Sequence, residues 1–79
     1  MNDGELEAEL LNHIGVLTGR HGIDSSTELI ESGILDSFAI LELFAFASEK
    51  FKVEFNPDDI ITKNVRTVSS FADLVRQRI

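Results

Sequence analysis

A single segment of this sequence brings a glycine, a carboxylate and a hydroxyl together where a helix is predicted to begin. The segment runs through Gly33, Ile34, Leu35, Asp36 and Ser37. Apolar residues at helical spacing follow it, so Ser37 is expected in the first helical turn. Its hydroxyl is the candidate chemical group of the chain, either as a nucleophile or as a point of covalent attachment. Taken alone, the pattern also fits a simpler interpretation, in which these residues only cap the helix.

Direct catalysis by Ser37 lacks the surrounding residues that a serine hydrolase needs. There is no Gly-x-Ser-x-Gly turn, and neither His13 nor His21 lies in a context typical of a catalytic base. A helical chain of 79 residues also has little room for an enclosed active site. Because the chain contains no cysteine, any thioester chemistry needs a thiol supplied by a cofactor. The sequence therefore does not indicate an enzyme.

The sequence predicts no metal site. His13 and His21 lie eight residues apart without a further ligand in register, so we expect a solvated helix position and a loop tip. Asp58 and Asp59 follow Pro57 and are interpreted as charges that favour a helix start. The spaced ligands of a calcium-binding EF-hand loop are missing around them.

Composition restricts the class of partner. The formal net charge of −7 argues against nucleic acid and anionic membranes, because both bind clusters of Lys and Arg. Protein partners with basic docking patches are expected instead. The chain is predicted to form one domain over residues 1–79, and to be a monomer. No stretch approaches the roughly 20 apolar residues that span a bilayer, and the acidic N-terminal residues do not resemble a signal peptide, so we expect a cytoplasmic protein without membrane insertion.

Three segments carry the apolar spacing of amphipathic helices. The first begins near Asn2, which with Glu5 resembles a capping box, and ends near Gly19. The second begins at Asp36, and the third follows Thr67, a predicted cap. The residues predicted to face the core are Leu6, Leu10, Leu11, Ile14, Leu17, Ile40, Leu43, Phe44, Ala47, Phe51, Val68, Phe71, Ala72, Val75 and Ile79.

Two connecting segments complete the predicted fold. Residues 23–36 show no sustained period and are predicted to form a long loop with aliphatic anchors. These anchors are Leu29, Ile30, Ile34 and Leu35. Asn56 and Pro57 indicate a short helix of one or two turns that ends by Asn64. Together the elements predict an all-α fold: a four-helix bundle with three longer helices, a short third helix, and a long loop between the first two helices.

Residues 31–51 closely resemble the phosphopantetheine attachment region of acyl and peptidyl carrier proteins. The residues at the signature positions are Gly33, Leu35, Asp36 and Ser37. Residues 26–29, 55–59 and 66–68 resemble other segments of that family, so the similarity covers nearly the whole chain, and the order of elements agrees with a bundle of acyl-carrier-protein type. The Asp-Ser-Phe sequence and the following Leu-Glu-Leu look more like stand-alone carriers such as the D-alanyl carrier protein than like fatty-acid carriers.

The resemblance implies that Ser37 carries a covalent 4'-phosphopantetheine arm, transferred from coenzyme A by a separate phosphopantetheinyl transferase. A phosphodiester at this position lies near the unpaired N–H groups of the helix start. Asp36 would cap the helix and help the transferase recognise the site, while Gly33 permits the turn that brings Leu35 inward. The thiol of the arm would hold an acyl or aminoacyl group as a thioester. It would receive this cargo from a loading ligase and present it to acyl-transfer enzymes in fatty-acid-like, polyketide, peptide or other specialised biosynthesis.

The outward face of the helix after Ser37 is the predicted docking surface. Its members are the apolar Phe38, Leu41 and Ala45 and the acidic Glu42 and Glu49. The apolar residues offer a small contact patch, and the carboxylates can steer basic partner surfaces. The alternative function is a helical interaction module that binds through this face without being modified. That alternative predicts that Ser37→Ala leaves partner binding intact.

Overall fold

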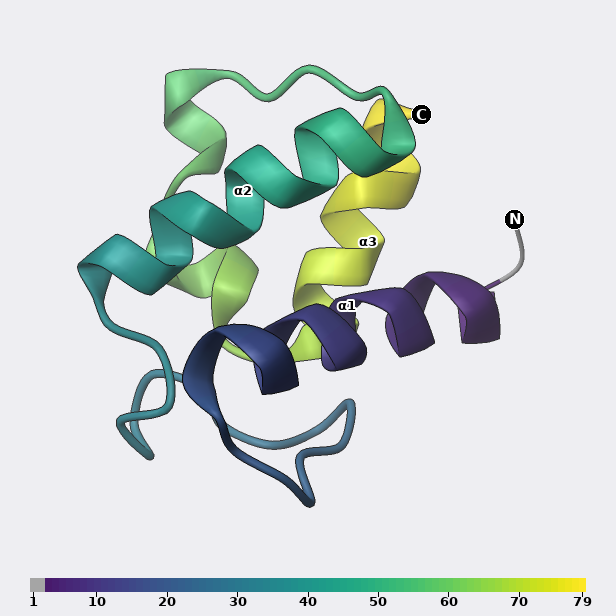
Figure 1. Cartoon of the computed structure of the whole chain (residues 1–79). Coiled ribbons are helices and arrows are strands. Elements are labelled where there is room, and N and C mark those ends of the chain that lie inside the picture. Colours follow the sequence, from purple (N-terminus) through teal and green to yellow (C-terminus); the bar gives the residue numbers. More distant parts are fainter. Residues whose placement is uncertain (1–2) are drawn as a thin grey trace.

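The computed structural model describes residues 3–79, and every regular element in this range is helical. The three α-helices are α1 (Asp3–Thr18), α2 (Ser37–Phe51) and α3 (Val68–Arg78). Two short 3₁₀ turns lie between α2 and α3: η1 (Pro57–Asp59) and η2 (Thr62–Val65) (Figure 1). The predicted all-α class is confirmed.

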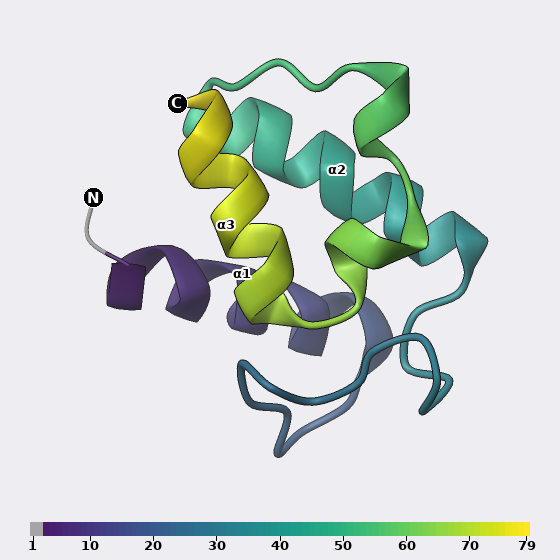
Figure 2. The same cartoon turned by 180° about the vertical axis from the view of Figure 1, so that it is seen from behind.

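The helices α1 and α2 lie on one side of the molecule, and α3 packs behind them (Figures 1 and 2). Residues 19–36 connect the end of α1 to the start of α2, and both views place these two helix ends on the same side. The capping role predicted for Asn2 lies outside the described residues. Within residues 3–79, none of the helices combines the length and apolar character that a bilayer span requires.

The core draws on all three α-helices and on the segments between them. Its buried apolar residues are Leu6, Leu10, Ile14, Leu29, Leu35, Ala39, Leu43, Phe44, Ala47, Val53, Val65, Val68, Phe71, Ala72, Leu74 and Val75. Phe44 and Phe71 meet edge to face, with ring centroids 4.9 Å apart. Two predicted core residues of α2, Ile40 and Phe51, are only partly buried. Ile79 is exposed because it lies beyond the last turn of α3.

Asp36 determines where α2 begins. Its backbone is extended, and its carboxylate Oδ1 accepts a hydrogen bond from the Ala39 N–H at 2.8 Å. Its carbonyl accepts a bond from the Ile40 N–H at 2.9 Å, the first of the helical ladder. The start of α3 is built in the same way, with the Thr67 hydroxyl accepting the Ser70 N–H at 3.1 Å. Both caps are therefore as predicted.

Residues 19–36 are tied to the region around η2 and α3. The Leu29 N–H donates to the Arg66 carbonyl at 2.8 Å, and Leu29 is fully buried. The Arg66 guanidinium donates three hydrogen bonds to Glu28, at 2.8, 3.0 and 3.1 Å, which lower the pKa of that carboxyl. The Ser69 N–H donates to the Ser25 carbonyl at 3.0 Å. These bonds hold the segment that precedes α2 against the rest of the molecule.

The region after α2 differs from the single short helix predicted there. η1 is a single 3₁₀ turn, and the chain then forms a second turn, η2. Ile60 and Ile61, which lie between η1 and η2, are adjacent in sequence and both exposed. Adjacent residues do not share a helix face, so they cannot supply the buried stripe that would continue a helix.

Asp59 has a larger structural role than the helix-start charge predicted for it. Asp59 is buried, with 5% of its surface exposed. Its carboxylate forms an ion pair with Arg78 of α3, at 2.5 Å between Oδ1 and Nη2. The carboxylate also accepts the Asn56 N–H at 2.9 Å. The hydrogen bond from Arg78 is the main reason that the pKa of Asp59 lies below its usual range. This pair joins η1 to the end of α3.

The solvated helix position predicted for His13 is wrong. Its imidazole is half-buried and stacks on Phe46 of α2, with ring centroids 3.8 Å apart and planes 7° from parallel. Its Nε2 is buried and has no hydrogen-bond partner among the described residues. Burial lowers the pKa of His13, and the negative charge of Glu42 partly opposes this effect. His13 is thus a packing residue between α1 and α2.

Replacing Asp36 by Ala should lower the free energy of unfolding by about 0.5–2 kcal/mol, the usual range for loss of a helix cap. Asp36→Asn keeps a side-chain oxygen that can accept the Ala39 N–H, so it should retain most of that free energy. Urea unfolding followed by circular dichroism measures both variants. Equal losses in the two variants would contradict a capping role.

The neutral His13 imidazole should make the fold less stable as the pH falls. The pKa of His13 in the folded chain lies below its ordinary value of 6.5, so the unfolded chain binds the proton more readily. Falling pH therefore stabilises the unfolded state relative to the folded state. The free energy of unfolding should therefore fall more between about pH 7.5 and about pH 5.5 for the wild type than for His13→Phe, which keeps the aromatic stack without the titration. Parallel pH profiles for the two proteins would disprove this assignment.

Candidate functional site

Ser37 is the first residue of α2, and it is exposed to solvent. The Ala39 N–H donates to the Asp36 carboxylate. The N–H groups of Ser37 and Phe38 also belong to the first turn of α2, where N–H groups have no acceptor within the helix. These two donors and the positive end of the helix dipole lie next to the Ser37 hydroxyl. The surroundings of this hydroxyl therefore favour a bonded anionic group.

The residues before Ser37 form a tight turn that separates inward from outward side chains. Gly33 has a left-handed backbone with φ of 79°, which a residue with a Cβ adopts at a cost. Its N–H donates to the Ile30 carbonyl at 3.0 Å, and the Leu35 N–H donates to the Leu29 carbonyl at 2.9 Å. Leu35 is buried, whereas the next two residues are exposed. Gly33 thus ends a turn three residues before the Asp36 cap, and Ser37 follows as the first residue of α2.

The predicted docking residues form one exposed face along α2. Phe38 is 69% exposed and Leu41 is 56% exposed, unusually high values for large apolar side chains. Glu42, Ala45 and Glu49 are also exposed. The face starts directly after Ser37, because helical spacing places Phe38 and Leu41 opposite the side on which Ala39 and Leu43 enter the core.

A phosphodiester fits these surroundings better than a metal ion does. An anion bonded to the Ser37 oxygen would meet backbone donors and the helix dipole, and the exposed position leaves this oxygen accessible to another protein. Among residues 3–79, no group of three or more His, Cys, Asp or Glu side chains is arranged to hold a metal ion. His21 is exposed in the loop.

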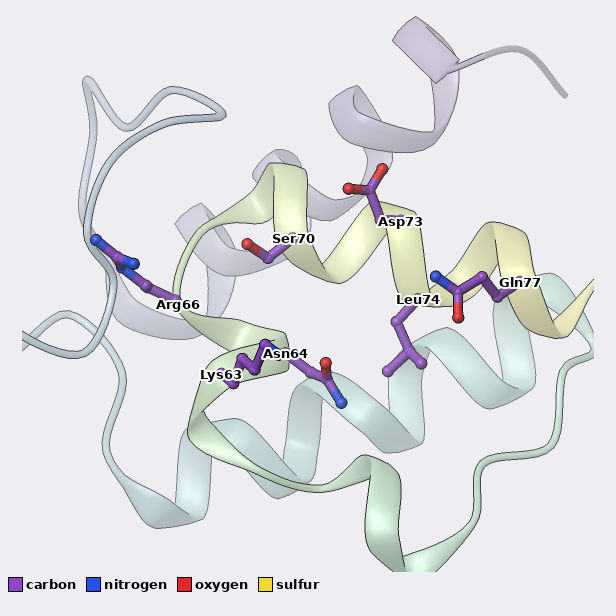
Figure 3. Close-up of a pocket in the computed structure, with 7 residues that line it drawn as sticks. All are labelled: Lys63, Asn64, Arg66, Ser70, Asp73, Leu74 and Gln77. Carbon is purple, nitrogen blue, oxygen red and sulfur yellow. The ribbon is translucent and has the colours of Figure 1, made fainter.

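A depression lies between η2 and α3, away from Ser37 (Figure 3). Its lining residues are Lys63, Asn64, Arg66, Ser70, Asp73, Leu74 and Gln77. The charged groups in it are largely engaged elsewhere, since Arg66 pairs with Glu28 and Asp73 pairs with Arg76. None of the predicted site residues lines it, and it adds nothing to the site around Ser37.

Arg20 is a neighbour of the site that sequence reasoning missed. It lines a depression between the end of α1 and the start of α2, together with Gly33, Asp36 and Phe38. No periodic pattern could identify this proximity, because Arg20 lies in a turn after α1 and reaches the site only through the path of the connecting loop.

Comparison with known proteins agrees with this geometry. The family described as "Phosphopantetheine attachment site" matches residues 8–75, which include Ser37 and the whole of α2. A relative from Serratia sp., named probable acyl carrier protein PigG, is 40% identical over 75 residues. The alignment covers 91% of this chain and 86% of that relative. With its exposed serine at a capped helix start and a family match over most of its length, this chain belongs to the phosphopantetheine-binding carrier proteins.

Proposed function

We propose that this chain is an acyl or aminoacyl carrier whose Ser37 is the attachment point of the 4'-phosphopantetheine arm. The observation that carries the proposal is the exposed Ser37 hydroxyl at the start of α2, beside first-turn N–H groups without intrahelical acceptors. We further propose that η1 and η2 together take the place of the short third helix in a bundle of acyl-carrier-protein type.

The modification is a phosphoryl transfer from coenzyme A, carried out by a separate transferase. The Ser37 oxygen forms a bond to the phosphorus next to the pantetheine, and the pyrophosphate bond to the departing adenosine 3',5'-bisphosphate breaks. The hydroxyl proton passes to a base of the transferase or to solvent. Once bound, the arm supplies a thiol, which the polypeptide lacks, for holding cargo as a thioester. The carrier itself then acts as a substrate and not as a catalyst.

Partner enzymes are proposed to dock on the exposed face of α2. Phe38 and Leu41 provide an apolar contact next to the attachment point, and Glu42 provides a charge that basic partner surfaces recognise. A docked enzyme would therefore have its active site close to the arm. The loading ligase and the later acyl-transfer enzymes would use the same face in turn, in a fatty-acid-like, polyketide, peptide or related pathway.

Incubating the purified chain with coenzyme A, Mg²⁺ and a broad-specificity transferase should add the mass of one arm. Ser37→Ala should fold normally, because the hydroxyl is exposed, and should gain no mass. Ser32→Ala is the matched control: Ser32 is an exposed serine of the same segment, and its loss should leave modification intact. Intact-protein mass spectrometry measures all three proteins. Failure of the wild type to gain the arm, or a gain in Ser37→Ala, would overturn the proposal.

A further inference from the structure

A depression of about 320 Å³ lies beside the proposed attachment point. Its walls include Leu17, Thr18 and Arg20 on one side and Ile34, Asp36 and Phe38 on the other. Ser37 is thus flanked in sequence by two wall residues. Figures 1 and 2 show how the end of α1 and the residues before α2 come together here.

Arg20 supplies a positive charge that no ion pair among residues 3–79 engages. Four of the seven Lys and Arg side chains form ion pairs, with Glu9, Glu28, Asp59 and Asp73. Within the part of the chain that the structure describes, Arg20 forms no such pair. In a chain with a net charge of −7, a cation without an acidic partner is available for an external anion.

Arg20 lies directly after the end of α1, and it also lines another depression together with Gly15, Val16 and Ile23. Gly19 and Gly22 on either side have left-handed backbones, with φ of 71° and 79°. The Thr18 hydroxyl donates to the Ile14 carbonyl at 2.7 Å and accepts the Arg20 N–H at 3.2 Å. This hydroxyl therefore links the start of the turn to the last turn of α1.

We propose that the attached arm does not swing freely but lies in this depression, with Arg20 paired to its phosphodiester. This inference rests on the proposed function of Ser37. The apolar side chains of Leu17, Ile34 and Phe38 would contact the dimethyl group of the pantetheine chain. The one acidic wall residue, Asp36, directs Oδ1 to the Ala39 N–H, which reduces its repulsion of the phosphodiester.

The depression suits the arm better than it suits a bulky acyl chain. Its walls carry the Thr18 hydroxyl, the Arg20 guanidinium and the Asp36 carboxylate beside the three apolar side chains. Such a mixed lining matches a phosphodiester followed by amide groups and a short branched segment. Because the site is open to solvent, added salt should screen the Arg20 pair and release the arm.

The test uses the holo chain loaded by the transferase with pantetheine labelled with ¹³C and ¹⁵N. Intact mass is measured first, so that absence of the arm is detected separately and refutes the proposed function together with this inference. In the loaded wild type, nuclear Overhauser contacts should join the dimethyl group of the arm to Leu17, Ile34 or Phe38. The arm amides should show positive heteronuclear Overhauser values, as expected for an ordered segment.

Arg20→Gln should keep the mass gain but lose these contacts, and the amide values should fall towards those of a free chain. Lys52→Gln is the matched control: it changes the net charge equally, but Lys52 lies at the opposite end of α2 from Ser37. It should retain the contacts. A loaded wild type with a mobile arm and no contacts would overturn the inference, as would an Arg20→Gln protein with unchanged contacts.

Discussion

The hydrogen bond between the Asp36 carboxylate and the Ala39 N–H is the contact on which the site depends. It fixes the first residue of α2, and burial of the stripe Ala39, Leu43 and Ala47 sets the rotation of the helix about its axis. With that rotation, Ala39 and Leu43 enter the core, while Ser37 remains in solvent beside Phe38. The cap and the buried stripe together thus determine which residues stabilise the fold and which stay exposed for the proposed partner contacts.

The sequence was informative where local pattern decides structure. The caps at Asp36 and Thr67 and the exposed positions of Phe38 and Leu41 follow from residue type and helical spacing. His13 could have been assigned to the α1 interface, because it lies between Leu10 and Leu17 at spacings of three and four residues.

Residue type and helical spacing could not predict contacts between segments that are distant in the sequence. The pairs Asp59–Arg78 and Glu28–Arg66 join residues far apart in sequence, and no periodicity connects them. The pair at Asp59 also accounts for part of the difference after α2, since it holds η1 against the end of α3 instead of leaving it as a regular helix start. The same limit applies to Arg20, whose position near Ser37 depends on how the connecting loop folds back.

The electrostatic arrangement is consistent with a carrier that is handled by other proteins. Ion pairs engage most of the cations, so the acidic residues on the α2 face dominate the field that a partner meets. Ser37, the proposed attachment point, lies at one end of this face. The central claim, that a single solvent-facing hydroxyl receives the arm, is tested most directly by tandem mass spectrometry of peptides from the transferase-treated chain. The account predicts the arm on the peptide that contains Ser37 and on none of the other six serines of the chain; an arm located on any other residue would contradict it.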